Sequence, residues 1–180
     1  MILIALGANL PSPAGKPADT LNAALAAFAV RSITIEMQSG FYRSPAWPNP
    51  LDPPFINAVA AVRTDLSPRD LLAALHEVEH SFGRRRGEPN APRTLDLDIL
   101  DYDGRIEQGP PILPHPRMEN RAFVLLPLRD VAPDWRHPVN GRSIAELIAA
   151  LPPTEIVRLP ASTTFRAAAS FPPTHGRSET

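Results

Sequence analysis

Two aspartates follow an arginine-rich stretch near the middle of the sequence. The segment GRRRGEPNAPRTLDLDIL, residues 83–100, ends in an apolar run that carries Asp96 and Asp98. If this run is a strand, alternate side chains point to opposite faces, so both carboxylates share one face about 6–7 Å apart. Such a pair suits Mg²⁺, which proteins hold with one or two carboxylates and the phosphates of a substrate. The spacing predicts either a magnesium site or, as the simpler alternative, a solvated strand face.

The arginines that precede these aspartates supply local positive charge. They are Arg84, Arg85, Arg86 and Arg93. Guanidinium groups bind phosphate oxygens through paired hydrogen bonds. Arginines alone are also compatible with a solvated loop, but next to two carboxylates they favour a polyphosphate substrate.

Composition limits the remaining function classes. The chain has 180 residues, of which 43% are hydrophobic and 21% are charged, and its net charge is −1. These values indicate one globular domain without the broad positive surface of nucleic-acid-binding proteins. There is no cysteine, which excludes disulfides, thiolate zinc sites and a cysteine nucleophile. The apolar N-terminus lacks the basic flank of a signal peptide, and no apolar run approaches about 20 residues. We expect a cytoplasmic monomer that binds neither nucleic acid nor membranes.

Hydrophobic periodicity predicts the elements that position these residues. Buried or alternating runs predict strands at residues 1–6, 33–42, 55–62 and 95–102, and a 3.6-residue period predicts helices over 18–28 and 67–82. Residues 43–54 contain five prolines and form a long loop, which is often functional. Smaller elements are expected at 105–107 (a hairpin strand), 121–131 (a helix interrupted by Pro127) and 143–150 (a capped helix).

The order β, α, β, β, α, β matches the ferredoxin-like split βαβ arrangement. It predicts an α+β sandwich: an antiparallel sheet with helices on one face and the other face free for a ligand. We expect residues 1–160 to form this domain. Residues 161–180 are rich in Ser, Thr, Pro and Ala and are expected to be a disordered tail.

Several short segments together resemble one enzyme family. They are LGAN (6–9), FYRSP (41–45), FINAV (55–59), PRTLDLDIL (92–100), PHPRM (114–118) and RAFV (121–124). In this combination, over about residues 1–150, the chain resembles the 6-hydroxymethyl-7,8-dihydropterin pyrophosphokinases of folate biosynthesis. The resemblance implies transfer of the β,γ-diphosphate of ATP to the pterin hydroxymethyl group, with release of AMP.

The same resemblance implies roles on the nucleotide side. Two Mg²⁺ ions are expected at Asp96 and Asp98, between these carboxylates and the phosphates. The residues expected to bind ATP are Glu79, Arg84, Arg86, Arg93, Ile99 and His115. The residues expected to act in catalysis lie in the same region and are Arg84, Arg93, His115 and Arg121. The loop between Arg86 and Arg93 lacks the tryptophan and extra arginine of some members, so we expect it to close differently.

A second set of residues is expected to bind the pterin. Phe55 and Phe123 resemble the two aromatic residues that sandwich the ring, although each alone is more typical of a core. Asn57 can donate to and accept from the pterin edge, as can backbone groups near Ser44 and Pro45. Gly7 belongs to the same expected site, and Trp47 is a candidate to cover the pterin.

Two alternatives stay open at this point. A ferredoxin-like module can bind RNA through its sheet, but this chain has few aromatic residues and carries Asp96 and Asp98, which repel phosphates without a metal. An enzyme of the same fold can instead transfer a γ-phosphate or a nucleotidyl group. The identity of the product distinguishes these enzymes.

Overall fold

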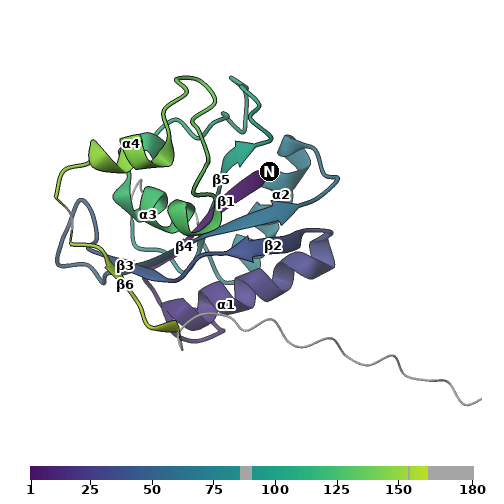
Figure 1. Ribbon diagram of the computed structural model, residues 1–180. Helices are drawn as coiled ribbons and strands as arrows, with labels where there is room; N and C mark the ends of the chain where they lie inside the picture. The colour runs from purple at the N-terminus through teal and green to yellow at the C-terminus, as the bar shows by residue number, and fades with distance from the viewer. Residues whose placement is uncertain (86–90, 154, 162–180) are drawn as a thin grey trace, which may run out of the picture.

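The computed structural model describes residues 1–85, 91–153 and 155–161. In this part of the chain, six strands form one antiparallel sheet in the order β5-β1-β4-β3-β6, with β2 also paired to β4 (Figure 1). The strands are β1 (Ile2–Ala8), β2 (Thr34–Gln38), β3 (Tyr42–Ser44), β4 (Phe55–Arg63), β5 (Asp96–Tyr102) and β6 (Val157–Arg158). The predicted α+β class and antiparallel sheet are confirmed.

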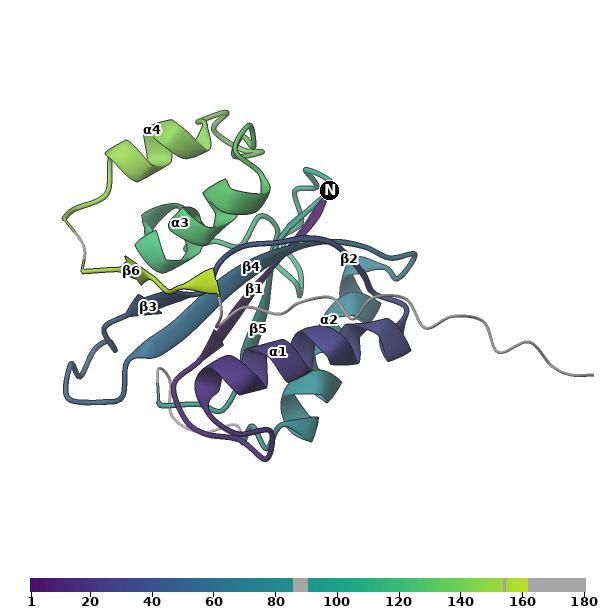
Figure 2. The same ribbon diagram turned by 60° about the horizontal axis from the view of Figure 1, so that its bottom comes forward.

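Helices cover both faces of the sheet, which corrects the expectation of helices on one face. The helices α1 (Pro17–Phe28) and α2 (Pro68–Ser81) pack on one face, and α3 (Ala122–Val131) and α4 (Ile144–Ala149) lie on the other (Figure 2). The reason lies in the central strands: β1 and β4 are buried along almost their whole length rather than at alternate residues. A strand with two apolar faces needs cover on both.

Each face has its own hydrophobic core. Ile4 and Leu6 of β1 pack with Leu25 of α1 and Leu75 of α2. Leu3, the alternate residue of the same strand, packs on the opposite face with residues of α3 and α4. The sheet is therefore the middle layer of three, and the period of two along β1 divides its side chains between the two cores.

Two helix starts agree with their sequence signals. Ser67 caps α2, and its Oγ accepts from the N–H of Asp70 at 3.2 Å, with Pro68 in the first turn. Ser143 and Glu146 form a reciprocal capping box at α4, in which the Ser143 N–H donates to Glu146 at 2.7 Å. The hydrogen bonds from Ser143 lower the pKa of Glu146.

Three smaller expectations were wrong. The predicted strand 33–42 divides into β2 and β3, and between them the Ser39 N–H donates to the Val59 carbonyl while the Ser39 hydroxyl accepts the Val59 N–H, both at 2.9 Å. The expected hairpin strand at 105–107 is reduced to an isolated bridge between Glu107 and Leu113. Helix α3 continues through Pro127 rather than stopping there. Two 3₁₀ turns, Ala29–Arg31 and Met118–Asn120, were not predicted.

The short strand β6 was also not predicted. It pairs with β3 and so covers an edge of the sheet that would otherwise be open. The expected disordered tail, residues 161–180, lies outside the described residues except for Ala161.

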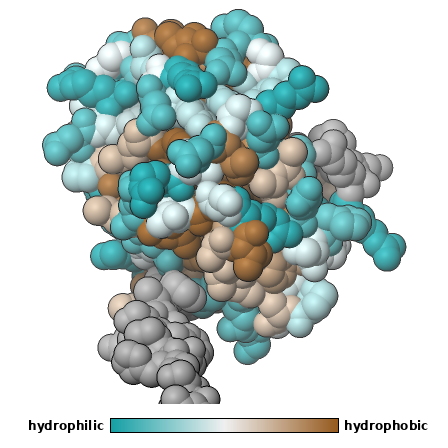
Figure 3. All heavy atoms as spheres, turned by 90° about the vertical axis from the view of Figure 1, so that its right-hand side faces the viewer, coloured by the Kyte–Doolittle hydropathy of each residue, from teal (hydrophilic) through white to brown (hydrophobic). Residues whose placement is uncertain are grey.

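On the face shown in Figure 3, hydrophobic side chains are interrupted by hydrophilic ones. Trp47 and Leu51, in the proline-rich loop, are 71% and 92% exposed. Among the described residues, no helix combines the length and apolarity required to cross a bilayer.

Candidate active site

The face of the sheet under α3 and α4 is only partly covered. Along β1, Leu3 is buried beneath these helices, whereas Gly7, further along the same face, lines a cleft of about 660 Å³. The same change occurs on β4, where Val59 is in the core and Asn57 lines the cleft. The uncovered end of this face is therefore the floor of the cleft.

Gly7 lies in the middle of that floor. It pairs with Asn57 of β4 on one side and with Asp96 of β5 on the other. A Cβ atom at this position would lie 3.4 Å from Oδ1 of Asn57 and 4.0 Å from Cβ of Asp96. Glycine thus keeps the floor open between two chemically different regions. We call them the charged side (Glu79, Arg84, Arg93, Asp96 and Asp98) and the neutral side (Ser44, Phe55, Asn57 and Phe123).

Ion pairs hold the charged side together. Arg84 donates to both Glu79 and Asp96 and also to the carbonyl oxygen of Leu95, at 3.1 Å. Arg93 donates to the other oxygen of Asp96 at 2.9 Å. Each oxygen of Asp96 therefore accepts a hydrogen bond from one arginine, and this carboxylate joins the two arginines.

Glu79 lies beneath this network rather than in the cleft. It projects from α2, is 6% exposed and accepts the N–H of Leu97 at 2.8 Å. Burial raises the pKa of Glu79 to about 7, although the Leu97 N–H and Arg84 act in the opposite direction. Burial would lower the pKa of Arg84, but Asp96 and Glu79 raise it above its ordinary value. Arg84 stays charged, and Glu79 fixes its position from below.

Asp98 is the more accessible of the two aspartates. Its side chain is 42% exposed, against 26% for Asp96, and Oδ2 lies 3.8 Å from Nε2 of His115. Loss of water around the carboxylate and the nearby charge of Asp96 raise the pKa of Asp98. Burial lowers the pKa of His115, and the neighbouring arginines add to this against the effect of Asp98. His115 is consequently neutral near pH 7.

The tautomer of His115 follows from its hydrogen bond. Nδ1 accepts the backbone N–H of Arg117 at 3.2 Å. The proton of the neutral ring therefore resides on Nε2, the nitrogen that lies toward Asp98. His115 can donate one hydrogen bond toward the charged side of the cleft.

Hydrogen bonds between uncharged groups order the neutral side. Asn57 is 5% exposed, and its Nδ2 donates to Oγ of Ser44 at 2.9 Å and to the carbonyl oxygen of Tyr42 at 3.5 Å. Both contacts cross the β3–β4 pair and fix the plane of the amide. Phe55 and Phe123 line the cleft beside it, and the guanidinium carbon of Arg121 lies 5.5 Å from the Phe123 ring centre.

The family model for 7,8-dihydro-6-hydroxymethylpterin-pyrophosphokinase (HPPK) matches residues 3–133, a range that includes both sides of this cleft. The chain belongs to the HPPK family. A relative from Synechocystis sp., named as a 2-amino-4-hydroxy-6-hydroxymethyldihydropteridine pyrophosphokinase, is 43% identical over 148 residues, 81% of this chain and 73% of its own. A Pseudomonas aeruginosa protein with the same name is also 43% identical, over 88% of this chain and 96% of its own.

A solved structure shares the HPPK fold. The HPPK-DHPS triple mutant of Plasmodium falciparum superposes with a TM-score of 0.62 at 15% identity, over 82% of this chain. The chain spans only 43% of that longer protein. At this identity the likeness concerns the fold alone.

The cleft brings together most of the residues predicted from the sequence, although their roles stay predictions. On the pterin side these are Gly7, Ser44, Pro45, Trp47, Phe55, Asn57 and Phe123. On the nucleotide and metal side they are Arg84, Arg93, Asp96, Asp98, His115 and Arg121. These residues come from four strands or their flanking loops, from the end of α2, from the segment before α3 and from the first turn of α3.

Two other predicted residues, Glu79 and Ile99, do not line the cleft. The side chain of Ile99 is 3% exposed and packs in the core on the α1 and α2 side, so its backbone is the part left to meet a nucleotide. Arg86 and the loop residues 87–90 lie outside the described residues.

Sequence reasoning missed three polar residues of the site region. Arg117 and Asn120 line the cleft, and Asn9 is buried and bonds to Arg93, a residue of the cleft lining. Asn9 lies in LGAN, Arg117 lies in PHPRM, and Asn120 immediately precedes RAFV, three of the segments that carry the resemblance. Their presence in those segments was the available signal, but nothing in their spacing distinguished them from neighbouring polar residues.

The donor set of the cleft fits Mg²⁺ only with help from a substrate. Asp96 and Asp98 share one face of β5. Within residues 1–85, 91–153 and 155–161, no group of three or more His, Asp or Glu side chains is arranged around a common point. Two carboxylates with phosphate oxygens from a nucleotide match the usual coordination of Mg²⁺.

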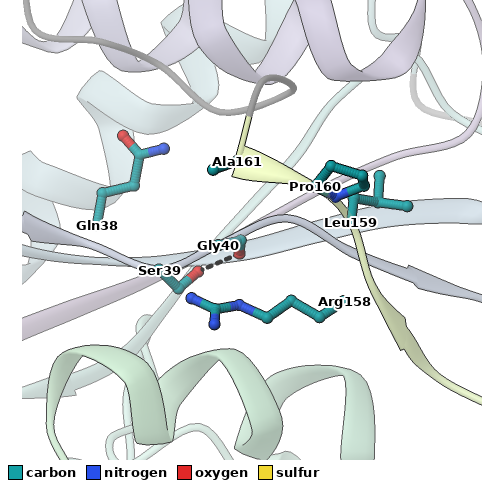
Figure 4. Close-up of a pocket in the computed structure, with 7 residues that line it drawn as sticks. All are labelled: Gln38, Ser39, Gly40, Arg158, Leu159, Pro160 and Ala161. Atoms are coloured by element: carbon teal, nitrogen blue, oxygen red, sulfur yellow. Dashed lines mark hydrogen bonds between the residues drawn. The ribbon is translucent and has the colours of Figure 1, made fainter.

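A second hollow, of about 520 Å³, lies beside β6 (Figure 4). Its lining consists of Gln38, Ser39, Gly40, Arg158, Leu159, Pro160 and Ala161. Arg158 is the one charged side chain among them, and its guanidinium lies 3.3 Å from Oδ2 of Asp130. Without carboxylates in this described lining, the hollow lacks the chemistry that the main cleft offers.

Proposed function

We propose that the main cleft carries out the reaction of the HPPK family. The hydroxymethyl oxygen of 6-hydroxymethyl-7,8-dihydropterin attacks the β-phosphorus of ATP, the bond from this phosphorus to the α,β-bridging oxygen breaks, and AMP leaves. The hydroxyl proton is lost to solvent or a phosphate oxygen. The observation that carries the proposal is the two-sided floor, with carboxylates and arginines on one side of Gly7 and an amide and aromatic rings on the other.

On the charged side, Asp96 and Asp98 would hold the Mg²⁺ that accompanies ATP. Two ions are expected, and when bound they would neutralise phosphate charge and polarise the β-phosphorus. The phosphates compete with Asp96 for Arg84 and Arg93, because guanidinium groups bind both kinds of oxyanion. This exchange would let the same two arginines bind the triphosphate without leaving an unpaired charge in the free protein.

His115 and Arg121 complete the phosphate-binding residues in this proposal. The Nε2–H of neutral His115 can donate to a phosphate oxygen near Asp98. Arg121 lines the cleft next to Phe123, between the two sides. Diphosphate transfer depends mainly on positioning and charge neutralisation, and these are the contributions that donors of this kind can make.

On the neutral side, Phe55 and Phe123 would stack on the pterin and Asn57 would bind its polar edge. The Asn57 amide is already oriented by Ser44 and Tyr42, which reduces the ordering required on binding. Backbone groups near Ser44 and Pro45 are further candidates for the same edge. Trp47 is 71% exposed in the adjoining loop and lines the cleft, so it would cover the ligand from outside.

We also propose that residues 1–160 form the catalytic domain, since the strands and helices that build the sheet and the cleft lie between Ile2 and Arg158. A monomeric state and a cytoplasmic location stay predictions. Light scattering on the purified protein and cell fractionation would check them.

Product identification tests the proposed function. The protein is incubated with ATP, Mg²⁺ and hydroxymethyldihydropterin, and nucleotides are separated by ion-exchange chromatography. We expect AMP that depends on the pterin and is abolished by EDTA. Formation of ADP would indicate γ-phosphate transfer, and formation of inorganic pyrophosphate would indicate nucleotidyl transfer. Either product in place of AMP would contradict the proposal.

A further inference from the structure

Asn9 bonds to two loops that flank the cleft, the proline-rich loop through Pro53 and the segment before β5 through Arg93. The side chain of Asn9 does not itself line the cleft. Asn9 follows β1 and is 2% exposed. Its Nδ2 donates to the carbonyl oxygen of Pro53 at 3.0 Å, and its Oδ1 accepts the N–H of Arg93 at 2.7 Å. The backbone N–H groups of Asn9 and Leu10 both donate to the carbonyl oxygen of Arg93 at 3.1 Å.

Pro53 and Arg93, the two hydrogen-bond partners of this amide, each precede a strand on a different side of the cleft floor. Pro53 lies near the end of the proline-rich loop, two residues before Phe55, which begins β4 on the neutral side. Arg93 lies three residues before Asp96, at the start of β5 on the charged side. A primary amide can donate and accept at once, so one buried group ties both loops to the end of β1.

We propose that Asn9 is a positioning residue that sets the two substrate-binding sides relative to each other. This inference rests on the proposed function. Diphosphate transfer requires the pterin oxygen to lie within about 3–3.5 Å of the phosphorus that it attacks, and a misplacement of about 1 Å can reduce the rate about a hundredfold. The Asn9 amide acts on this separation through Pro53 and Arg93, not through contact with a substrate.

Two substitutions separate the two halves of the Asn9 contact. Asn9→Asp retains an oxygen that can accept the Arg93 N–H but loses the donor to Pro53. Asn9→Ala loses both contacts. The matched control is Thr20→Val, which removes the hydroxyl of a fully buried residue in α1, close in sequence to Asn9. That hydroxyl bonds Ser12 at 2.7 Å and the Lys16 carbonyl at 3.2 Å, with no contact to either side of the cleft.

The experiment measures kcat and both KM values by AMP release, together with the melting temperature of each variant. For Asn9→Asp we expect the KM for the pterin to rise about tenfold, the KM for ATP to change less than twofold and the fold to be retained. For Asn9→Ala we expect kcat to fall by roughly a hundredfold. Thr20→Val should lower the melting temperature and leave kcat and both KM values unchanged.

The inference is overturned if both Asn9 variants keep wild-type kinetic constants, or if Thr20→Val changes them in the same way at an equal loss of melting temperature. If Asn9→Ala does not fold, the separation of the two KM values in Asn9→Asp decides alone. Failure of the proposed function is distinguishable, because the wild-type protein would then release no pterin-dependent AMP.

Discussion

The two sides of the cleft floor are ordered by different forces. On the neutral side, Asn57 and Ser44 bond each other across neighbouring strands, so the Asn57 amide is already oriented in the free protein. On the charged side, Asp96 is bonded to Arg84 and Arg93, so opposite charges neutralise each other. In our proposal the pterin would bind the first side without rearrangement, whereas the triphosphate would replace existing ion pairs on the second.

This difference indicates how a small cleft can contain strong charges and remain stable. A buried charge without a partner is costly, and Glu79, Arg84 and Asp96 avoid that cost by contacting one another. Neutral hydrogen bonds cost less to bury and need no such compensation. We therefore expect substitutions on the charged side to affect catalysis most, and substitutions on the neutral side to affect pterin binding.

The largest effect is expected for Asp98→Asn. This change keeps the shape of the side chain but removes the charge that would hold Mg²⁺. We expect kcat to fall by about 10²–10³-fold, by analogy with the loss of one electrostatic contact to a transition state, with pterin affinity unchanged. Steady-state kinetics and calorimetric pterin binding check this. Asp134→Asn, at an exposed position outside the cleft lining, is the control, and equal activity of the two variants would refute a metal role for Asp98.

Arg84→Ala and Arg93→Ala sharpen the comparison within the charged side. Each removes one phosphate contact, so kcat/KM for ATP should fall by roughly a hundredfold in both. Only Arg84→Ala also leaves Glu79 buried without its cation, and this variant should lose about 1–3 kcal/mol of stability more than Arg93→Ala. Urea unfolding measures the difference. Equal stability of the two variants would show that the burial of Glu79 does not require its ion pair with Arg84.

Asn57→Ala tests the neutral side. Loss of the amide should raise the KM for the pterin about tenfold and leave the KM for ATP unchanged, because one or two neutral hydrogen bonds disappear. Ser44→Ala keeps the amide but removes its partner, and should produce a smaller change of the same kind. An increase in the KM for ATP in either variant would contradict the division of the cleft into two sides.

The smallest kinetic effect is expected for Tyr42→Phe. Tyr42 belongs to β3 but does not line the cleft. Its hydroxyl donates a hydrogen bond to Asp130 at 3.0 Å. Burial and the hydrogen bond to Asp130 raise the pKa of Tyr42, so the hydroxyl stays protonated over the usual assay range. Loss of a hydrogen bond to a charged group should cost about 1.5–3 kcal/mol in the free energy of unfolding, with kcat and KM unchanged. A raised KM for the pterin would show that this contact belongs to the neutral side.

The sequence predicted the relation between Asp96 and Asp98 because a period of two is a local property of a strand. It also predicted the helix start at Ser67, where the cap and its partner Asp70 are three residues apart. The break after Gln38 was missed, although Ser39-Gly40 is a dipeptide typical of turns and loops. The hydrogen bond from the Val59 N–H to the Ser39 hydroxyl at this break joins residues 20 positions apart, which no local pattern encodes.

Contacts between distant residues account for what was missed in the site. The side chain of Asn9 bonds to Pro53 and Arg93, which lie 44 and 84 positions further along the chain, and no local pattern encodes these bonds. The pairing of Arg84 and Arg93 with Asp96 depends on the orientation of the two arginine side chains. The arginine-rich sequence does not determine that orientation. Residue types thus indicated the chemistry, whereas the three-dimensional contacts show how its charges are balanced in the free protein.

The most direct test is a crystal structure of the protein with Mg²⁺, a non-hydrolysable ATP analogue and hydroxymethyldihydropterin. We expect metal at Asp96 and Asp98, both arginines on the triphosphate instead of on Asp96, and the pterin between Phe55 and Phe123 with its edge on Asn57. A pterin bound elsewhere, or a triphosphate that leaves Asp96 paired with Arg84 and Arg93, would contradict the two-sided cleft.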